Sequence, residues 1–139
     1  MKARIFHYDR LIKSEDLNHH QTLFAGRCAE WFVEAGFIAA ASVLPSENIV
    51  CLKIHGLTFN TPMHSGDIAH FESRIAYTGR SSLRVYVSLK ALAGNAPNVT
   101  GFITFVHVNA QGEAVPHGLS LDLDTQEDYD LNKLARAQE

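Results

Sequence analysis

The chain has 139 residues, a hydrophobic content of 46% and a formal net charge of −3. This length fits one domain with a hydrophobic core of ordinary size. The slightly acidic balance, without a Lys/Arg cluster, offers no basic field to nucleic acid or to a membrane surface, so we expect neither partner. The two cysteines, Cys28 and Cys51, are too few for a disulfide framework and lie in apolar surroundings. We expect two buried, inert thiols.

Targeting and membrane-spanning segments are not visible in the sequence. Residues 1–11 contain no apolar stretch typical of a signal peptide. The apolar run over residues 37–44 is far shorter than the about 20 residues that cross a bilayer. We therefore expect a cytoplasmic protein. Because no repeat or linker is visible, we expect a single domain over residues 1–124, followed by a polar tail over residues 125–139.

In chain order, residues 3–8 alternate partly between apolar and polar and predict a short first strand. Residues 14–22 predict a polar turn region, and one long helix follows it within the segment over residues 16–45. Pro45 ends the helix because the residue before a proline disfavours helical backbone. The helix is apolar nearly all round, which is typical of a helix buried in the protein. Polar chemistry is tolerated only in its first half, which carries Arg27, Glu30 and Glu34.

Further strands are predicted after the helix by alternating and β-branched residues, with tight turns between them. They span residues 49–59, 68–77, 83–93 and 99–108. The tail begins with Thr125 and Asp128, a loose capping box that predicts either a terminal helix or a disordered tail. One helix followed by a run of strands indicates an α+β fold, in which one antiparallel sheet curls around the helix.

Several segments, in this order, resemble the hot-dog-fold acyl-CoA thioesterases, in particular the branch of bacterial acyl-CoA hydrolases and brain acyl-CoA hydrolase. They are residues 16–36, LTFNTPMHSGD at 57–67, TGRSS at 78–82 and TFVHVNAQGEAVP at 104–116. The resemblance covers residues 3–117 and implies a curved antiparallel sheet wrapped around one long central helix. It also implies hydrolysis of an acyl-CoA to free acid and CoA, without a metal or redox cofactor. The family acts as a homodimer at least, and often as a hexamer built as a trimer of dimers.

The resemblance also implies where the substrate binds. Pantetheine enters a tunnel at the dimer interface, and the thioester meets the start of the helix, with Asn18 and the backbone N–H of Gly26 near its carbonyl. Free N–H groups at a helix N-terminus stabilise developing negative charge. Arg80 is either a ligand of the CoA phosphates, whose geometry a guanidinium matches, or a solvated turn residue. The positions that the resemblance assigns to CoA contacts are Thr58, Asn60, Arg80, Ser81 and Ser82.

One position departs from the family pattern. The catalytic carboxylate of that branch corresponds to Val33, whose side chain cannot take a proton from water. In one explanation Glu34 replaces it after a rearrangement of the helix, because neighbouring helical residues point about 100° apart. In another, Glu30 reaches the same space from the adjacent turn. In the last, the site binds acyl-CoA without hydrolysing it. The plainer alternative is a polar stripe in which Arg27 and Glu30 form an ion pair.

The adjacent residues His19 and His20 precede the helix. No carboxylate or cysteine set at metal spacing accompanies them, so we expect polar turn residues and no metal site. The related hot-dog dehydratases use a His before the helix and a Glu on it, and His20 with Glu34, or His19 with Glu30, loosely resembles that pair. Dehydration or hydration of acyl thioesters is therefore an alternative activity. No Gly-x-Ser-x-Gly elbow supports a serine nucleophile.

Overall fold

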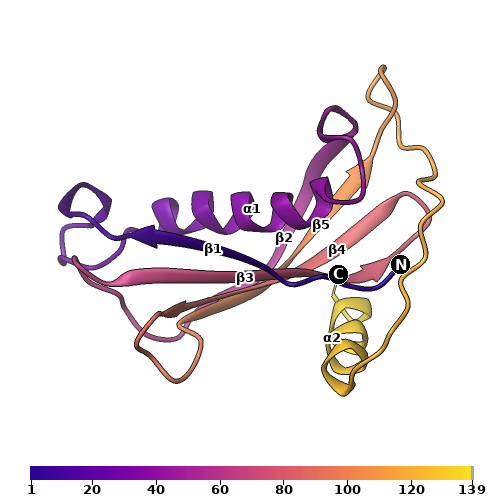
Figure 1. Cartoon of the computed structure of the whole chain (residues 1–139). Coiled ribbons are helices and arrows are strands. Elements are labelled where there is room, and N and C mark those ends of the chain that lie inside the picture. Colours follow the sequence, from indigo (N-terminus) through magenta and orange to yellow (C-terminus); the bar gives the residue numbers. More distant parts are fainter. Residues whose placement is uncertain (139) are drawn as a thin grey trace.

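The structure is a computed structural model that describes residues 1–138. The strands form one antiparallel sheet in the order β1-β3-β4-β5-β2, with α1 on one face and α2 on the other (Figure 1). This arrangement confirms the predicted α+β fold. The elements are β1 (Phe6–Leu11), α1 (Ala25–Ala41), β2 (Ile49–Phe59), β3 (Ile68–Thr78), β4 (Ser82–Ala91), β5 (Val99–His107) and α2 (Gln126–Arg136), with short 3₁₀ turns at Ser14–Asp16 and Ser46–Asn48.

The predicted strands after the helix agree with β2, β3, β4 and β5 to within two residues at each end. The first strand was predicted too early, over residues 3–8, because the chain before Phe6 does not pair with β3. The first residues of the chain pair instead with the segment around Asp122. The amino group of Met1 donates to Ser120 O at 2.9 Å, and Met1 O accepts from the N–H of Asp122 at 2.7 Å.

The helix α1 begins at Ala25, well inside the predicted range of residues 16–45, and ends at Ala41. Residues before it form a turn because Asn18 competes with helical backbone bonding. The Asn18 Oδ1 atom accepts from the N–H groups of His20 and Thr22, at 2.8 and 3.2 Å. Gln21, at φ 64°, takes a left-handed conformation that cannot continue a right-handed helix.

Only one face of α1 is buried within this chain, so the prediction of a helix buried all round was wrong for a single copy. The face on the sheet is formed by Cys28, Trp31, Phe32, Ala35, Gly36, Ala39 and Ala40. On the outer side Glu30, Glu34 and Ile38 are exposed. One sheet can cover only one side of a cylinder, and nothing else in residues 1–138 covers the other side of α1 (Figure 1).

The outer edge of the sheet at β2 is also open. Val50, Leu52 and Ile54 have exposed fractions of 45, 67 and 39%. Cys51 lies on the same strand and is exposed, contrary to the prediction of a buried thiol, because β2 has a neighbour on one side only. Cys28 is buried as predicted, and its burial raises its thiol pKa to about 11.

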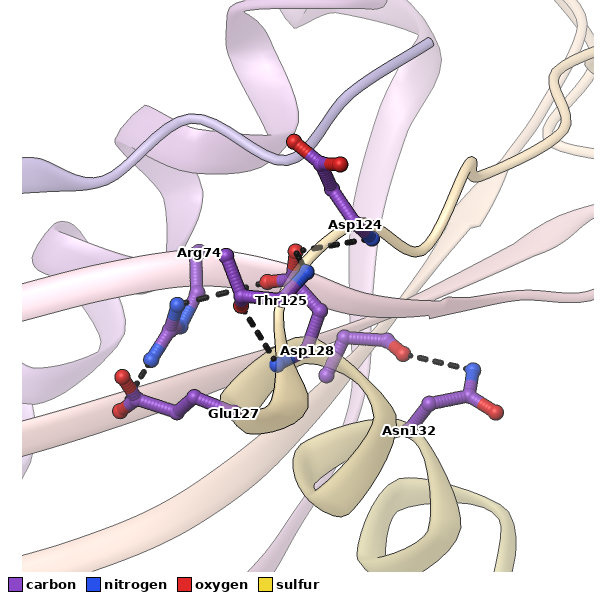
Figure 2. A network of polar contacts seen from close by, with 7 residues as sticks. Arg74, Asp124, Thr125, Glu127, Asp128 and Asn132 are labelled. Carbon is purple, nitrogen blue, oxygen red and sulfur yellow. Dashed lines mark hydrogen bonds and ion pairs between the residues drawn. The ribbon is translucent and has the colours of Figure 1, made fainter.

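The tail forms the helix α2, the first of the two predicted alternatives. Leu131 and Ala135 pack against Ala76 and Phe102 on the sheet face opposite α1. The predicted capping box is confirmed: the N–H of Asp128 donates to the Thr125 hydroxyl at 3.1 Å, and the Thr125 N–H donates to the Asp128 carboxylate at 3.2 Å. Figure 2 shows how this helix start is held to β3. The Arg74 guanidinium pairs with Glu127 and with Asp128.

Gly101 on β5 sets how closely the neighbouring strand β2 and the helix α1 approach β5. A Cβ atom at this position would lie 2.9 Å from His55 O and 3.1 Å from the ring of Phe32. Backbone atoms cannot move aside without breaking the strand pairing. We expect Gly101→Ala to lower the free energy of unfolding by about 1–3 kcal/mol, measured by urea denaturation. Ser88→Ala, a half-buried position of β4, is the control and should change it by less than about 0.5 kcal/mol. Equal stability of Gly101→Ala and the parent would contradict this close approach.

Acid should weaken the docking of α2 through Asp128. Partial burial acts to raise the pKa of this carboxyl, but hydrogen bonds from the N–H groups of Thr125 and Asp124 outweigh it, and the pKa is lowered. A lowered folded-state pKa adds stability above the unfolded value of about 3.9, and this contribution is lost as the pH falls through the folded value. Urea unfolding should show Asp128→Asn about 1 kcal/mol less stable at neutral pH, with the gap closing below pH about 4. Asp130→Asn is the matched control on α2, and a constant gap for Asp128→Asn would exclude this role.

Candidate active site

A cavity of about 320 Å³ lies where the turn before α1 meets the end of β2. Two polar side chains that the sequence analysis singled out, Asn18 and Asn60, both line it. The Asn60 N–H donates to Asn98 O at 2.7 Å, which ties the end of β2 to the start of β5. The remaining lining residues are Thr22, Leu23, Ala25, Cys28, Phe59, Thr61, Pro62, Met63 and Val99. The cavity wall is therefore apolar and polar in similar measure, with two carboxamides and two threonines among its residues.

The side chain of Asn18 is fixed by its own turn. Its Oδ1 atom accepts from the N–H groups of His20 and Thr22, and its Nδ2 group donates to the Thr22 hydroxyl at 3.0 Å. The Asn18 N–H donates to Thr22 O at 2.8 Å, which closes the turn. A side chain held in this way loses little conformational entropy when it binds a ligand.

The start of α1 presents uncapped backbone N–H groups beside this cavity. Phe24 occupies the N-cap position and has no side-chain acceptor for the first turn. The Leu23 N–H donates to Met63 O at 2.8 Å and holds the helix start against the cavity wall. Unpaired N–H groups at a helix start, together with the helix dipole, favour negative charge there. Ala25 lines the cavity, and Gly26 follows it as an exposed residue.

Glu34 lies apart from this cavity. It stands nine residues after Ala25, which corresponds to about 13 Å along the helix axis. It lines a separate, open hollow of about 400 Å³ with Tyr8, Val33, Phe37 and Ile38. Within one chain, the structure therefore brings Asn18 and Asn60 together with the start of α1, and leaves Glu34 and Val33 outside that group.

The carboxylate of Glu34 is held by β1. The Tyr8 hydroxyl donates to Glu34 Oε2 at 2.5 Å, and Arg10 Nη1 donates to the Tyr8 oxygen at 3.1 Å. Burial raises the pKa of Tyr8, and the hydrogen bond to Glu34 raises it further, so Tyr8 stays protonated and keeps donating at neutral pH. Tyr8 and Arg10 were not predicted from the sequence, because only the pairing of β1 with β3 brings them beside α1.

Glu30 lines neither of these two cavities and is 65% exposed. Arg27 Nη1 lies 3.8 Å from Glu30 Oε2, which confirms the predicted ion pair. The same guanidinium lies 3.5 Å from the buried carboxylate of Asp16. Glu30 therefore belongs to a surface charge network around Arg27.

The positions assigned to CoA contacts fall at opposite ends of the sheet. Thr58 and Asn60 lie at the end of β2, whereas Arg80 and Ser81 lie in the turn between β3 and β4 and Ser82 begins β4. Strand β4 separates the two ends by about 30 Å. Arg80 is exposed, and the N–H of His107 donates to Ser81 O at 2.7 Å. One copy of the chain therefore does not place both groups around one ligand.

The rings of His19 and His20 lie together in the turn before α1, with centroids 3.9 Å apart, and both are exposed. Within residues 1–138, no hydrogen bond or ion pair joins either ring to Glu30 or Glu34. The His–Glu pairing of the dehydratases is thus not formed in one copy.

Comparison with known proteins identifies a family for this chain. The family model of the thioesterase superfamily matches residues 20–96. The uncharacterized acyl-CoA thioester hydrolase YkhA of Bacillus subtilis is 29% identical over 73% of this chain, and the matched region spans 60% of that relative's length. No helix in residues 1–138 is long and apolar enough to cross a membrane.

Solved structures with a similar fold belong to acyl-CoA hydrolases and thioesterases. An acyl-CoA hydrolase from Bacillus cereus is 26% identical, with a TM-score of 0.86 over 95% of this chain and 82% of that one. An apo-hexameric acyl-CoA thioesterase is also 26% identical, with a TM-score of 0.86 over 96% of this chain and 86% of that one. The antiparallel sheet that curves beneath α1 and the match over more than half of the sequence show that this chain belongs to the thioesterase superfamily and has the hot-dog fold.

Proposed function

We propose that this protein hydrolyses the thioester of an acyl-CoA to the free acid and CoA. The observation that carries the proposal is the cavity in which Asn18 and Asn60 meet the uncapped start of α1, in a chain of the thioesterase superfamily. Relatives at 26 and 29% identity are named as acyl-CoA hydrolases. The reaction requires no metal or redox cofactor, and CoA takes part only as a portion of substrate and product. A cytoplasmic location belongs to the same proposal.

The complete site, in this proposal, is built from two copies of the chain. The open edge of β2 exposes Val50, Leu52 and Ile54, and such an edge pairs readily with another strand. The uncovered side of α1 next to it exposes Ile38 together with Glu30 and Glu34. Two-fold pairing of β2 strands runs antiparallel, so the Phe59 end of one copy faces the Ile49 end of the other. The turn at Arg80 lies at that second end, so it would approach Asn60 of the other copy. An assembly of three such dimers has support from the hexameric relative.

Glu34 is the carboxylate that we assign to water activation. The hydrogen bond from Tyr8 occupies Oε2 and leaves Oε1 available to a water molecule. Glu34 takes a proton from this water as its oxygen adds to the thioester carbonyl carbon. The N–H groups at the start of α1 and the Asn18 amide stabilise the resulting oxyanion. When the C–S bond breaks, the proton passes from Glu34 to the sulfur of CoA.

A binding protein without hydrolytic activity is the second candidate, and Val33 favours it. This residue lies beside Glu34 in the open hollow and provides no carboxylate at the position where the acyl-CoA hydrolase branch carries its acid. An acyl-CoA-binding protein would keep the cavity and show no release of thiol. The dehydratase alternative lacks such an observation, because His19 and His20 do not contact a glutamate within one copy.

Turnover separates these candidates. The purified protein is incubated with short-chain and long-chain acyl-CoAs and a thiol-reactive dye, and Glu34→Gln is expected to lower kcat by about 100-fold or more because the general base is lost. Glu30→Gln is the matched control on the same helix and should keep kcat within about threefold, because Glu30 lies in a surface ion pair. CoA binding, followed by calorimetry, should survive both substitutions. If acyl-CoA binds but no substrate releases thiol, the hydrolase proposal fails and the binding candidate replaces it.

The dimer can be tested at β2. Leu52→Glu places a charge on the open edge, where Leu52 is 67% exposed, and should convert an oligomer into a monomer of 15.4 kDa. Leu92→Glu, at a position 53% exposed in the turn after β4, is the control and should leave the assembly intact. Light scattering after size exclusion measures both masses. Turnover should fall with Leu52→Glu because half of the site is lost, and a monomeric parent protein would refute the shared site.

A further inference from the structure

A group of metal-ligating side chains lies on the sheet face opposite α1, outside the proposed active site. In the pairing of β1 with β3, His7 lies opposite Glu72, and Asp9 lies opposite His70. Side chains alternate along a strand, so these residues point away from α1 while Tyr8, between them, points toward Glu34. No local sequence pattern marks the group, because His7 and His70 lie 63 positions apart in the sequence.

The spacing of the ligand atoms fits one metal ion. His7 Nδ1 lies 3.4 Å from His70 Nε2 and 3.7 Å from Glu72 Oε1, and His70 Nε2 lies 3.6 Å from the same oxygen. Ligands bound at 2.0–2.1 Å in a tetrahedral zinc site are about 3.3–3.4 Å apart. The point in the plane of the three atoms that is equidistant from them lies about 2.1 Å from each. A tetrahedral ion sits just outside that plane, so the three atoms would have to approach one another by about 0.1–0.3 Å to bind it.

A carboxylate orients one of the imidazoles. His70 Nδ1 lies 2.5 Å from Asp9 Oδ1, so the proton of the neutral ring sits on Nδ1. The Nε2 atom then carries the lone pair, 3.4 Å from His7 Nδ1 and 3.6 Å from Glu72 Oε1. Metal-bound histidines in proteins usually make this second hydrogen bond, which fixes the tautomer and raises the basicity of the ligand.

The site is accessible and its charge suits a cation. The side chains of His7 and Glu72 are 57 and 45% exposed, whereas His70 is 14% exposed. Lys90 and Arg74 bring positive charge to this face, but Arg74 is paired with Glu127 and Asp128, so the carboxylates of Asp9 and Glu72 outnumber the remaining charge of Lys90. His70 and Glu72 also line a hollow of about 250 Å³, which leaves room for water in a fourth position.

We propose that His7, His70 and Glu72 bind one divalent transition metal ion of the zinc class, with Asp9 as the positioning residue. Two imidazoles and one carboxylate favour Zn²⁺ and its neighbours over Mg²⁺ and Ca²⁺, which require more oxygen ligands. The ion would join the edge strand β1 to β3. Because β1 lies at the opposite edge of the sheet from β2, a dimer formed through β2 leaves the site open.

The test uses the full chain without a histidine tag. Calorimetric titration with ZnCl₂ should show one ion per chain, and excess Zn²⁺ should raise the unfolding temperature while equal Mg²⁺ does not. His7→Ala and Glu72→Gln should each weaken binding by more than about 100-fold. Asp9→Asn keeps all ligands and should weaken it by about 10- to 100-fold. All three positions are at the surface, and unfolding curves without metal establish that each variant folds.

The control variant replaces two histidines outside the proposed site, His19 and His20, whose rings also lie close together. The double variant His19→Ala/His20→Ala should bind Zn²⁺ within threefold of the parent. Loss of binding in this variant, or unchanged binding in both His7→Ala and Glu72→Gln, would overturn the site. A stoichiometry of one that survives Asp9→Asn without any weakening would overturn the positioning role of Asp9.

Discussion

The close seating of α1 on the sheet is the constraint on which the other features depend. The helix face toward the sheet is made largely of small residues, and a Cβ atom at Gly36 would lie only 2.7 Å from Ile103 Cδ1. Small residues allow a helix to lie close to its neighbour, and the aromatic rings of Trp31 and Phe32 then fill the space beside them. With the helix axis fixed, its uncapped start is also fixed against Met63, at the wall of the Asn18 cavity.

The same packing leaves the side of α1 that faces away from the sheet without another secondary-structure element against it in residues 1–138. A sheet of five strands covers one side of α1, and the open hollow beside it is lined by Glu34, which is exposed, and by Val33, which is half-buried. Glu34 therefore does not share a cavity with Asn18 inside a single copy, since Asn18 is fixed in the turn before α1 and Glu34 stands about 13 Å along the helix from its start. The proposed second copy would resolve this conflict, because it would cover the apolar edge of β2 while it supplied the distant groups. Assembly and catalysis are, on this view, consequences of one packing arrangement.

Local pattern predicted the fold better than it predicted the sites. Apolar alternation located β2 and β5 because it reports which residues face the core, and a burial pattern is what determines a strand. The polar turn predicted before the helix is confirmed, and the Asn18 hydrogen bonds that hold it explain why α1 begins only at Ala25. The exposure of Cys51 depends on which strand lies at the edge of the sheet. That order follows from tertiary pairing and has no local signal.

The register in which β1 pairs with β3 determines which of its side chains face α1 and which face away from it, and no local sequence pattern predicts this register. The side chains of β1 alternate, so Tyr8 and Arg10 support Glu34 on one face while His7 and Asp9 meet His70 and Glu72 on the other. A shift by one residue would exchange the two faces and remove both groups at once. Pairing of Phe6 to Leu11 with β3 is what prevents such a shift. An ion bound between β1 and β3 would therefore hold in place the strand that orients Glu34, which links the metal group to the carboxylate through the strand they share.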